Sequence, residues 1–233
     1  MAAIFVTGIG TGIGKTFVTA GLLRHVREQG GEAGGFKPLV SGYESAPGSD
    51  PAFLLEAMGR SVSEEAVATI APFRFKAALS PDMAARAEGR EIAFEALVAF
   101  CRRAAFSPGT VLIEGVGGVM VPLDATHTTL DLMTVLDLPV VLVAGSYLGS
   151  LSHTLTAVAV LKHAGVRVLS LVVNDSGTGE VPLSHTAGTL RRFLPDLAVV
   201  TVPRNPRSLD FARAATAILR DAGTGAPGHE IAG

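Results

Sequence analysis

The sequence lacks tryptophan, has a single cysteine and carries little charge. Charged residues are 17% of the 233 residues and the net charge is −2, which gives no electrostatic case for binding nucleic acid or an anionic membrane. One cysteine, Cys101, excludes an internal disulfide and a cysteine metal cluster. The apolar helical pattern around Cys101 predicts a buried small hydrophobic side chain.

Long apolar runs are absent too. No run approaches the ~20 residues that a membrane span needs, and Met1 leads into a predicted strand without the basic segment of a signal peptide. We therefore expect a cytoplasmic protein with no membrane partner. The 48% of hydrophobic residues is enough for a sizeable core. We expect one domain over residues 1–222 and a flexible Gly/Ala/Pro-rich tail over 223–233.

A glycine-rich turn follows the first short apolar run, and it ends in Gly14-Lys15-Thr16. A helical pattern begins directly after it. Strand, glycine loop and helix form a cradle for nucleotide phosphates, in which Lys15 reaches the β and γ phosphates and the Thr16 hydroxyl ligates Mg²⁺. The common motif has four residues between its first glycine and Gly-Lys, whereas five separate Gly8 from Gly14. The alternative is an ordinary tight turn between a strand and a helix.

Two further charged residues, Lys37 and Asp50, are candidates for the site. Lys37 follows the predicted strand 33–36, and the carboxyl ends of parallel strands line the ligand crevice. The alternative is a surface lysine. Asp50 precedes a predicted helix over 51–59, where Ser49 or Asp50 would cap the helix. Helix capping by Asp50 is favoured locally over a role as Mg²⁺ ligand.

Glu114 ends a β-branched apolar run, 110–114, and a glycine cluster follows it. The run lacks polar alternation, as a parallel strand buried on both faces does. An acid at such a strand tip is costly without a positive partner. We favour a role in holding Mg²⁺ over a purely structural salt bridge.

Strand and helix patterns alternate along the chain. This predicts an α/β protein: one parallel sheet of about six to seven strands, flanked by helices on both faces, like a P-loop NTPase. Later strands are predicted at 138–145, 166–173 and 198–202, with a short hairpin strand at 119–123. Residues 60–106 are predicted to be helical in pieces, and the remaining helices are predicted at 131–136, 151–164, 183–194 and 207–222. Right-handed crossovers place the strand tips along one edge.

The chain resembles the dethiobiotin synthetase family of biotin biosynthesis. The matching residues are Val6-Thr7-Gly8 through Gly14-Lys15-Thr16, Lys37-Pro38, Ser41-Gly42, Asp50, Glu114-Gly115-Val116-Gly117-Gly118, Leu148-Gly149, His153, Asn174-Asp175 and Pro203. The resemblance implies ATP-dependent carboxylation of 7,8-diaminopelargonic acid with CO₂. Ring closure then gives dethiobiotin, ADP and phosphate, by way of a carbamate and a carbamic–phosphoric anhydride.

The resemblance also implies roles for individual residues. The catalytic residues would be Lys37, Lys15 and Thr11, and the Mg²⁺ ligands Thr16, Asp50 and Glu114. ATP would be bound by Gly12, Ile13, Gly14, Lys15, Thr16, Phe17, Glu114, Gly115, Val116, Gly117, Asn174, Asp175, Val202, Pro203 and Arg204. The diamine substrate would be bound by Ser41, Gly118, Leu151 and Ser152. Members of the family are homodimers with the site at the interface, where the segment 149–153 of the partner chain holds the substrate carboxylate.

Other classes of P-loop protein remain as alternatives. A dimeric partitioning or placement ATPase usually carries a lysine four residues before the glycine of Gly-Lys-Thr, and that place is Gly10. An ATP-dependent amidating enzyme of corrin synthesis needs a glutaminase domain with a cysteine nucleophile, and Cys101 has no glycine-rich elbow around it. A plain nucleotide-binding module is the third alternative.

Overall fold

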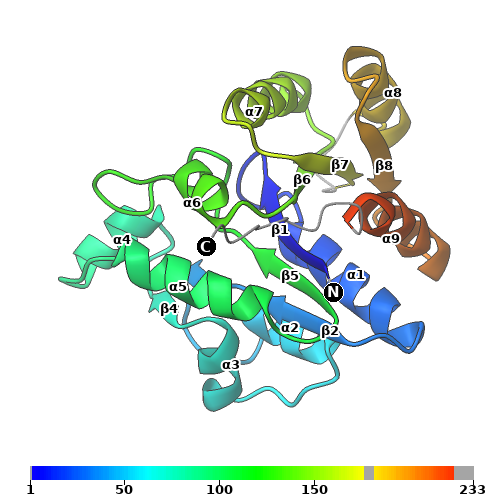
Figure 1. The fold of residues 1–233 in the computed structure, drawn as a ribbon. Helices are drawn as coiled ribbons and strands as arrows, with labels where there is room; N and C mark the ends of the chain where they lie inside the picture. The colour runs from blue at the N-terminus through cyan, green and yellow to red at the C-terminus, as the bar shows by residue number, and fades with distance from the viewer. Residues whose placement is uncertain (1, 176–180, 223–233) are drawn as a thin grey trace, which may run out of the picture.

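A six-stranded parallel sheet forms the centre of the computed structural model, which describes residues 2–175 and 181–222. Its strands lie in the order β2-β5-β1-β6-β7-β8 (Figure 1). Their bounds are β1 Ala2–Gly8, β2 Ala33–Phe36, β5 Thr110–Glu114, β6 Val140–Gly145, β7 Val168–Asn174 and β8 Ala198–Val202. The predicted fold class is therefore confirmed.

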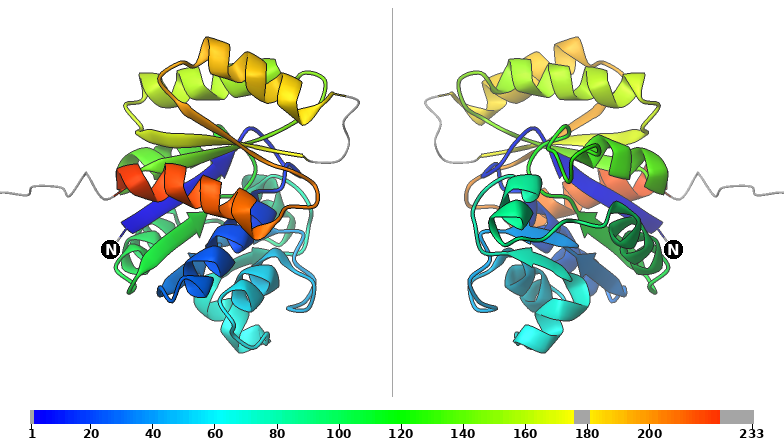
Figure 2. Two further views of the ribbon diagram at one scale, coloured as in Figure 1. Left: turned by 90° about the vertical axis from the view of Figure 1, so that its right-hand side faces the viewer. Right: turned by 90° about the vertical axis from the view of Figure 1, so that its left-hand side faces the viewer.

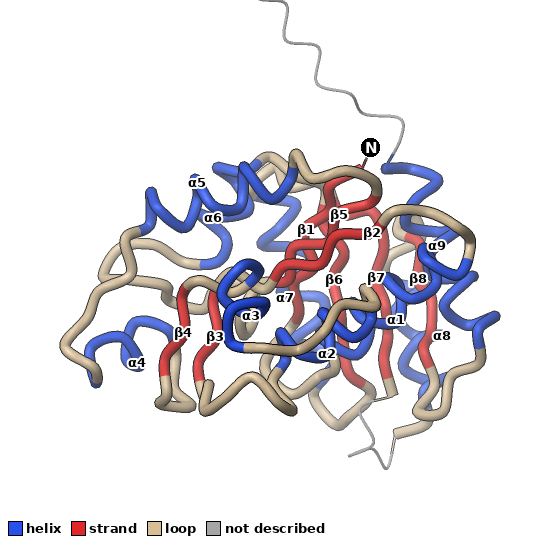
Figure 3. The backbone as a smooth tube through the Cα atoms, turned by 90° about the horizontal axis from the view of Figure 1, so that it is seen from below, coloured by secondary structure: helices blue, strands red, loops and turns tan. Residues whose placement is uncertain are grey.

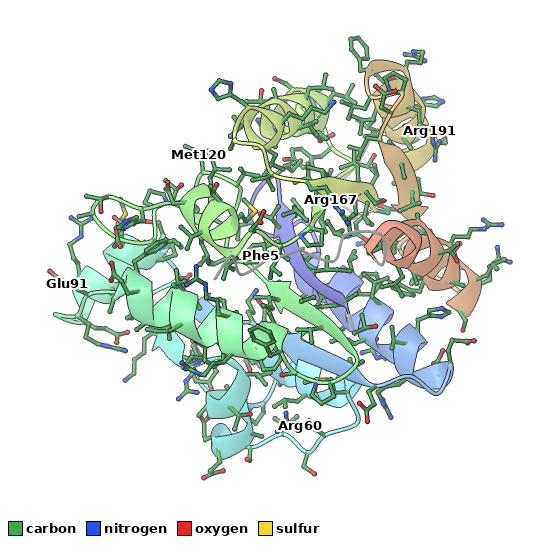
Figure 4. The ribbon with its side chains drawn as sticks, viewed as in Figure 1. Phe5, Arg60, Glu91, Met120, Arg167 and Arg191 are labelled. Carbon is green, nitrogen blue, oxygen red and sulfur yellow. The ribbon has the colours of Figure 1, made fainter. Side chains whose placement is uncertain are left out.

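The central strands are apolar on both faces, which explains their uninterrupted hydrophobic runs. Along β1, Phe5 packs into one hydrophobic cluster, whereas Ile4 and Val6 pack into the other. Successive side chains of a strand point to opposite faces, so both faces of the sheet are covered. Phe5 lies in the middle of the molecule, while Glu91 and Arg60 lie at its edge (Figure 4).

Helices cover the two faces as separate layers (Figure 2). The layer on one side comprises α1 Lys15–Glu28, α2 Asp50–Ala57, α3 Glu64–Ile70 and α9 Ser208–Ala222. The layer on the other side comprises α4 Pro81–Ala87, α5 Phe94–Ala105, α6 Thr129–Leu136, α7 Ser150–His163 and α8 Leu183–Phe193. Cys101 is fully buried on α5, as predicted.

A second small sheet was not predicted. Strand β3, Leu39–Ser41, pairs in parallel with β4, Phe73–Phe75, and the pair lies apart from the main sheet (Figure 3). The prediction that 60–106 is helical in pieces is therefore wrong at 73–75. A strand of three residues is too short for a periodic signal, and its stability comes from the partner strand.

The predicted hairpin strand at 119–123 is also wrong. The segment between β5 and α6 is a loop with two isolated bridges, one from Gly118 to Ile9 and one from Pro122 to Thr128. Proline lacks the amide hydrogen that a strand ladder needs. The predicted tail, 223–233, lies outside the described residues. Within residues 2–175 and 181–222, no helix is long and apolar enough to cross a bilayer.

Candidate active site

A cavity of about 570 Å³ opens where the neighbouring strands β2, β5 and β1 end. The loop between β1 and α1 forms one wall of this cavity. Gly12 and Gly14 have φ angles of 72° and 91°, a left-handed conformation that glycine adopts without strain. This backbone turns the start of α1 toward the cavity, as a phosphate cradle requires.

Lys15 lies at the start of α1, and its ammonium donates a hydrogen bond to the carbonyl oxygen of Gly10 at 2.7 Å. Only 7% of the residue is exposed. Burial and the nearby ammonium of Lys37 lower the pKa of Lys15 to about 8. A phosphate anion bound in the loop would favour the charged form again.

Lys37 and Glu114 form a buried ion pair between the ends of β2 and β5. The Lys37 ammonium lies 2.5 Å from Glu114 Oε1 and 3.0 Å from Asp50 Oδ2. Burial opposes the charged form of Lys37, but the two carboxylates outweigh burial and raise its pKa above the ordinary value. Lys37 is 4% exposed, so the alternative of a surface lysine is wrong.

Glu114 also contacts the end of the phosphate loop. Its Oε1 accepts a hydrogen bond from the Thr16 hydroxyl at 2.7 Å. Its Oε2 is buried and has no hydrogen-bond partner. A buried carboxylate oxygen without a partner is costly, and a cation beside it would remove that cost. The donor set of Thr16, Glu114 and Asp50 consists of oxygen atoms, which Mg²⁺ prefers, so it fits this ion.

Capping of α2 is performed by Ser49 and not by Asp50. The Ser49 hydroxyl accepts a hydrogen bond from the amide of Ala52, and Asp50 is the first residue of the helix. The local preference for Asp50 as the cap is therefore wrong. Since Ser49 satisfies the helix end, the Asp50 carboxylate is available to Lys37 and to the cavity.

The cavity brings together about half of the predicted site residues. Those lining it are Thr11, Gly12, Gly14, Lys15, Thr16, Lys37, Ser41, Asp50, Glu114, Val116 and Gly117. Ile13 lies beneath the loop in the core, and Gly115 is packed against Phe5. Gly118 forms an antiparallel bridge with Ile9, beside the start of the phosphate loop.

A second group of predicted residues lies beyond the loop, at the ends of β7 and β8. The Asn174 amide donates to the carbonyl oxygen of Ile13 at 2.9 Å, and its Oδ1 is buried without a partner. The amide of Asp175 donates to the carbonyl oxygen of Val202. Pro203 and Arg204 follow Val202 in the loop after β8. These residues do not line the 570 Å³ cavity.

Close packing explains why position 14 is glycine. A Cβ atom there would lie 2.2 Å from Asn174 Nδ2, and the positive φ would strain any other residue. The phosphate loop therefore reaches over the end of β6 to contact β7 directly.

Phe17, Leu151 and Ser152 lie away from the cavity. Phe17 is 40% exposed and its ring packs against Phe211 of α9, with ring centroids 5.9 Å apart. Leu151 and Ser152 are in the first turn of α7, where Ser152 is exposed. Within the chain itself, these residues contribute nothing to the cavity wall.

Part of the cavity wall could not be predicted from the sequence. It comprises Val40, Ala78, Leu79, Ser80, Pro81 and Val121. The Ser80-Pro81 pair signals the start of a helix but carries no sign of a binding role. The small β3–β4 sheet brings this segment to the site, because the amide of Gly42 donates to the carbonyl oxygen of Ala77 at 3.0 Å.

Histidine, cysteine and acidic side chains do not gather into a metal cluster of three or more anywhere in 2–175 and 181–222. The candidate Mg²⁺ set supplies two carboxylates and one hydroxyl, and the octahedral coordination of Mg²⁺ needs further oxygen ligands. In P-loop proteins, the phosphates of the nucleotide and water supply those ligands.

Comparison with known proteins finds relatives along most of the chain. A family model described as an AAA domain matches residues 2–209. The ATP-dependent dethiobiotin synthetase BioD of Acidiphilium cryptum (strain JF-5) is 49% identical over 198 residues, which cover 83% of this chain and 89% of that protein. The protein of the same name from Anaeromyxobacter dehalogenans (strain 2CP-C) is 38% identical over 219 residues, which cover 94% and 96%.

Solved structures of P-loop NTPases share the fold. A ParA family ATPase from Chlorobium tepidum TLS superposes with a TM-score of 0.54 at 13% identity, covering 96% of this chain and 94% of that chain. The cell division ATPase MinD of Pyrococcus furiosus gives a TM-score of 0.51 at 17% identity, covering 99% and 93%. At these identities the likeness concerns the fold alone.

Proposed function

The chain belongs to the dethiobiotin synthetase family of ATP-dependent ligases, and on that premise we propose how its cavity performs the reaction. The substrates are 7,8-diaminopelargonic acid, CO₂ and ATP, and the products are dethiobiotin, ADP and phosphate. The chemistry joins two anions, a carbamate and the γ-phosphate of ATP. The residues of the site must therefore bring negative charges together.

The reaction consists of three bond-forming steps. One amine of the substrate adds to CO₂ and loses a proton, which gives a carbamate. A carbamate oxygen attacks the γ-phosphorus and ADP leaves, which gives a carbamic–phosphoric anhydride. The second amine attacks the anhydride carbon and loses a proton, phosphate leaves with the carbamate oxygen that had attacked the γ-phosphorus, and the cyclic urea closes.

The single observation that carries this proposal is the pair of buried ammonium groups, Lys15 and Lys37, in one cavity with the phosphate loop. Lys15 would bind the β and γ phosphates. Lys37, held by Glu114 and Asp50, would lie between the γ-phosphate and the carbamate. Fixed positive charge at the point where two anions meet lowers the barrier without reorganisation during the reaction.

Mg²⁺ would be held by Thr16, Glu114 and Asp50, together with phosphate oxygens. It would supply further positive charge on the β and γ phosphates. The unpartnered Oε2 of Glu114 and the Thr16 hydroxyl are the protein atoms that support this assignment. Lys37 keeps the two carboxylates close to each other before the ion binds, because it contacts both.

The diamine would lie between Thr11 of the phosphate loop and Ser41 at the end of β3. Thr11 and Ser41 line that space with hydroxyl groups, and backbone amides near Gly118 would bind substrate oxygens. The adenine would lie near Asn174 and the loop after Val202. The buried Oδ1 of Asn174 is an acceptor that suits an amino group of a base.

Transfer of oxygen from bicarbonate to phosphate tests the reaction path. The bicarbonate is labelled with ¹⁸O and is added just before the enzyme, which limits exchange of its oxygen with water. We expect one labelled oxygen in the released phosphate for each dethiobiotin formed, after correction for that exchange. Mass spectrometry of the phosphate measures this. Release of unlabelled phosphate at the rate of dethiobiotin formation would contradict attack by a carbamate oxygen, since water would then be the attacking group.

We propose further that two copies form a homodimer in which Leu151 and Ser152 of one copy bind the substrate of the other. The exposure of Ser152 on the first turn of α7 supports this. Sedimentation should give a dimer. Ser152→Trp should raise the KM for the diamine about tenfold and leave nucleotide binding unchanged. A fully active monomer, or an unchanged KM in that variant, would contradict the shared site.

A further inference from the structure

The loop of residues 42–49 joins two residues of the cavity, Ser41 at the end of β3 and Asp50 at the start of α2. At its beginning, the amide of Tyr43 donates to the carbonyl oxygen of Phe75 on β4, at 2.9 Å. The Tyr43 ring lies beneath the guanidinium of Arg74, whose Cζ is 5.2 Å from the ring centroid. The start of the loop is therefore fixed to the small sheet.

The middle of the loop is held by one side chain from α3. The Glu64 carboxylate accepts a hydrogen bond from the amide of Ala46 at 2.7 Å through Oε1. Through Oε2 it accepts a hydrogen bond from the Tyr43 hydroxyl at 2.8 Å. Both loop residues are buried, and burial together with the hydrogen bond to Glu64 raises the pKa of Tyr43 to about 12. Hydrogen bonds to an ionised carboxylate are among the stronger ones in proteins.

The hydrogen bonds continue from Ala46 to the helix that carries Asp50. The carbonyl oxygen of Ala46 accepts from the Ser49 hydroxyl at 2.7 Å and from the Ser49 amide at 3.3 Å. The same hydroxyl caps α2, whose first residue is Asp50. The Asp50 side chain is 47% exposed, so its place beside Lys37 depends on where the backbone of the loop and helix puts it.

We propose that Glu64 is a positioning residue of the active site, which acts through Ala46 and Ser49 to hold Asp50 in place for Mg²⁺. Glu64 does not line the cavity. The inference rests on the proposed role of Asp50 as a ligand of Mg²⁺. It concerns the binding of the metal–nucleotide complex and does not depend on which second substrate reacts.

Calorimetric binding of the non-hydrolysable imido analogue of ATP, with and without Mg²⁺, tests this proposal. The Kd without Mg²⁺ divided by the Kd with Mg²⁺ gives a ratio that measures how much Mg²⁺ strengthens binding. In Glu64→Ala we expect this ratio to fall about fivefold to tenfold, while the Kd without Mg²⁺ stays unchanged. A loss of general folding would instead weaken binding equally in both conditions.

Matched variants separate the loss of the Glu64 hydrogen bonds to the loop from the loss of a negative charge or of packing on α3. Glu65→Ala removes an acid from the same first turn of α3 and should leave the ratio at the wild-type value. Glu64→Gln keeps an oxygen that accepts from the Ala46 amide, so it should restore most of the ratio. Tyr43→Phe removes only the hydroxyl, and it should lower the ratio even if Glu64→Ala does not fold.

A double-mutant cycle with Asp50→Asn shows whether Glu64 acts through Asp50. In the Asp50→Asn background, Glu64→Ala should change the ratio by less than twofold. An undiminished effect in that background, or an unchanged ratio in both Glu64→Ala and Tyr43→Phe, would overturn the proposal. Because no turnover is measured, failure of the proposed reaction would leave these ratios unaffected and would be recognised separately.

Discussion

Lys37→Met is expected to lower kcat by ~10²–10³-fold, by analogy with the removal of a preorganised hydrogen-bond donor from an oxyanion hole. The Lys37 ammonium is buried between Glu114 and Asp50 in the cavity that contains the phosphate loop. Methionine fills a similar volume but carries no charge, so the carbamate and the γ-phosphate would repel each other. Steady-state formation of ADP and dethiobiotin measures the loss.

The same substitution should also destabilise the fold, and this effect must be separated from catalysis. Removing Lys37 leaves the Glu114 carboxylate, which is 1% exposed, without its cation. We expect the free energy of unfolding to fall by about 3–5 kcal/mol in the absence of nucleotide and Mg²⁺. Denaturant unfolding in metal-free buffer measures this loss.

The double variant Lys37→Met/Glu114→Gln provides the control. It removes both charges of the buried pair, so stability should return close to the wild-type value. Turnover should stay low, because the ammonium is still missing and the substitution of Glu114 also removes a proposed Mg²⁺ ligand. A kcat for Lys37→Met within a few-fold of wild type would show that Lys37 has only a structural role.

The site residues at the carboxyl ends of the strands could be predicted from the sequence, because each of them carries a local signal. Glycines before Lys15, an apolar run ending at Glu114 and a lysine directly after β2 are visible without the fold. Parallel topology then requires that these strand ends lie together. The order β2-β5-β1 places the three as immediate neighbours.

Tertiary contacts decided what the sequence could not predict. Asp50 and Ser49 are both good helix caps. In the structure Ser49 caps α2, and the Asp50 carboxylate lies 3.0 Å from the Lys37 ammonium. The wall around Leu79 reaches the cavity because β4 pairs with β3, and strands of three residues give no periodic signal. The contact of Glu64 with the loop likewise joins residues 18 positions apart, without any motif.

The central claim is that the nucleophile toward ATP is a carbamate made from the substrate, and not water. A switch ATPase with the same fold would hydrolyse ATP without any diamine. In this protein, ADP release should instead depend on the diamine and on CO₂, because the attacking oxygen exists only after they combine. Correct placement of that oxygen should accelerate ADP release by at least ~10²-fold over the rate with water alone.

The most direct measurement is the rate of ADP release from MgATP and bicarbonate, with and without 7,8-diaminopelargonate. Nonanoate is the matched control, because it has the same carbon chain and carboxylate but no amines. We predict rapid ADP release with the diamine only, in step with dethiobiotin, and background rates with nonanoate or without bicarbonate. Equal rates with and without the diamine would contradict the account and favour a nucleotide-dependent switch.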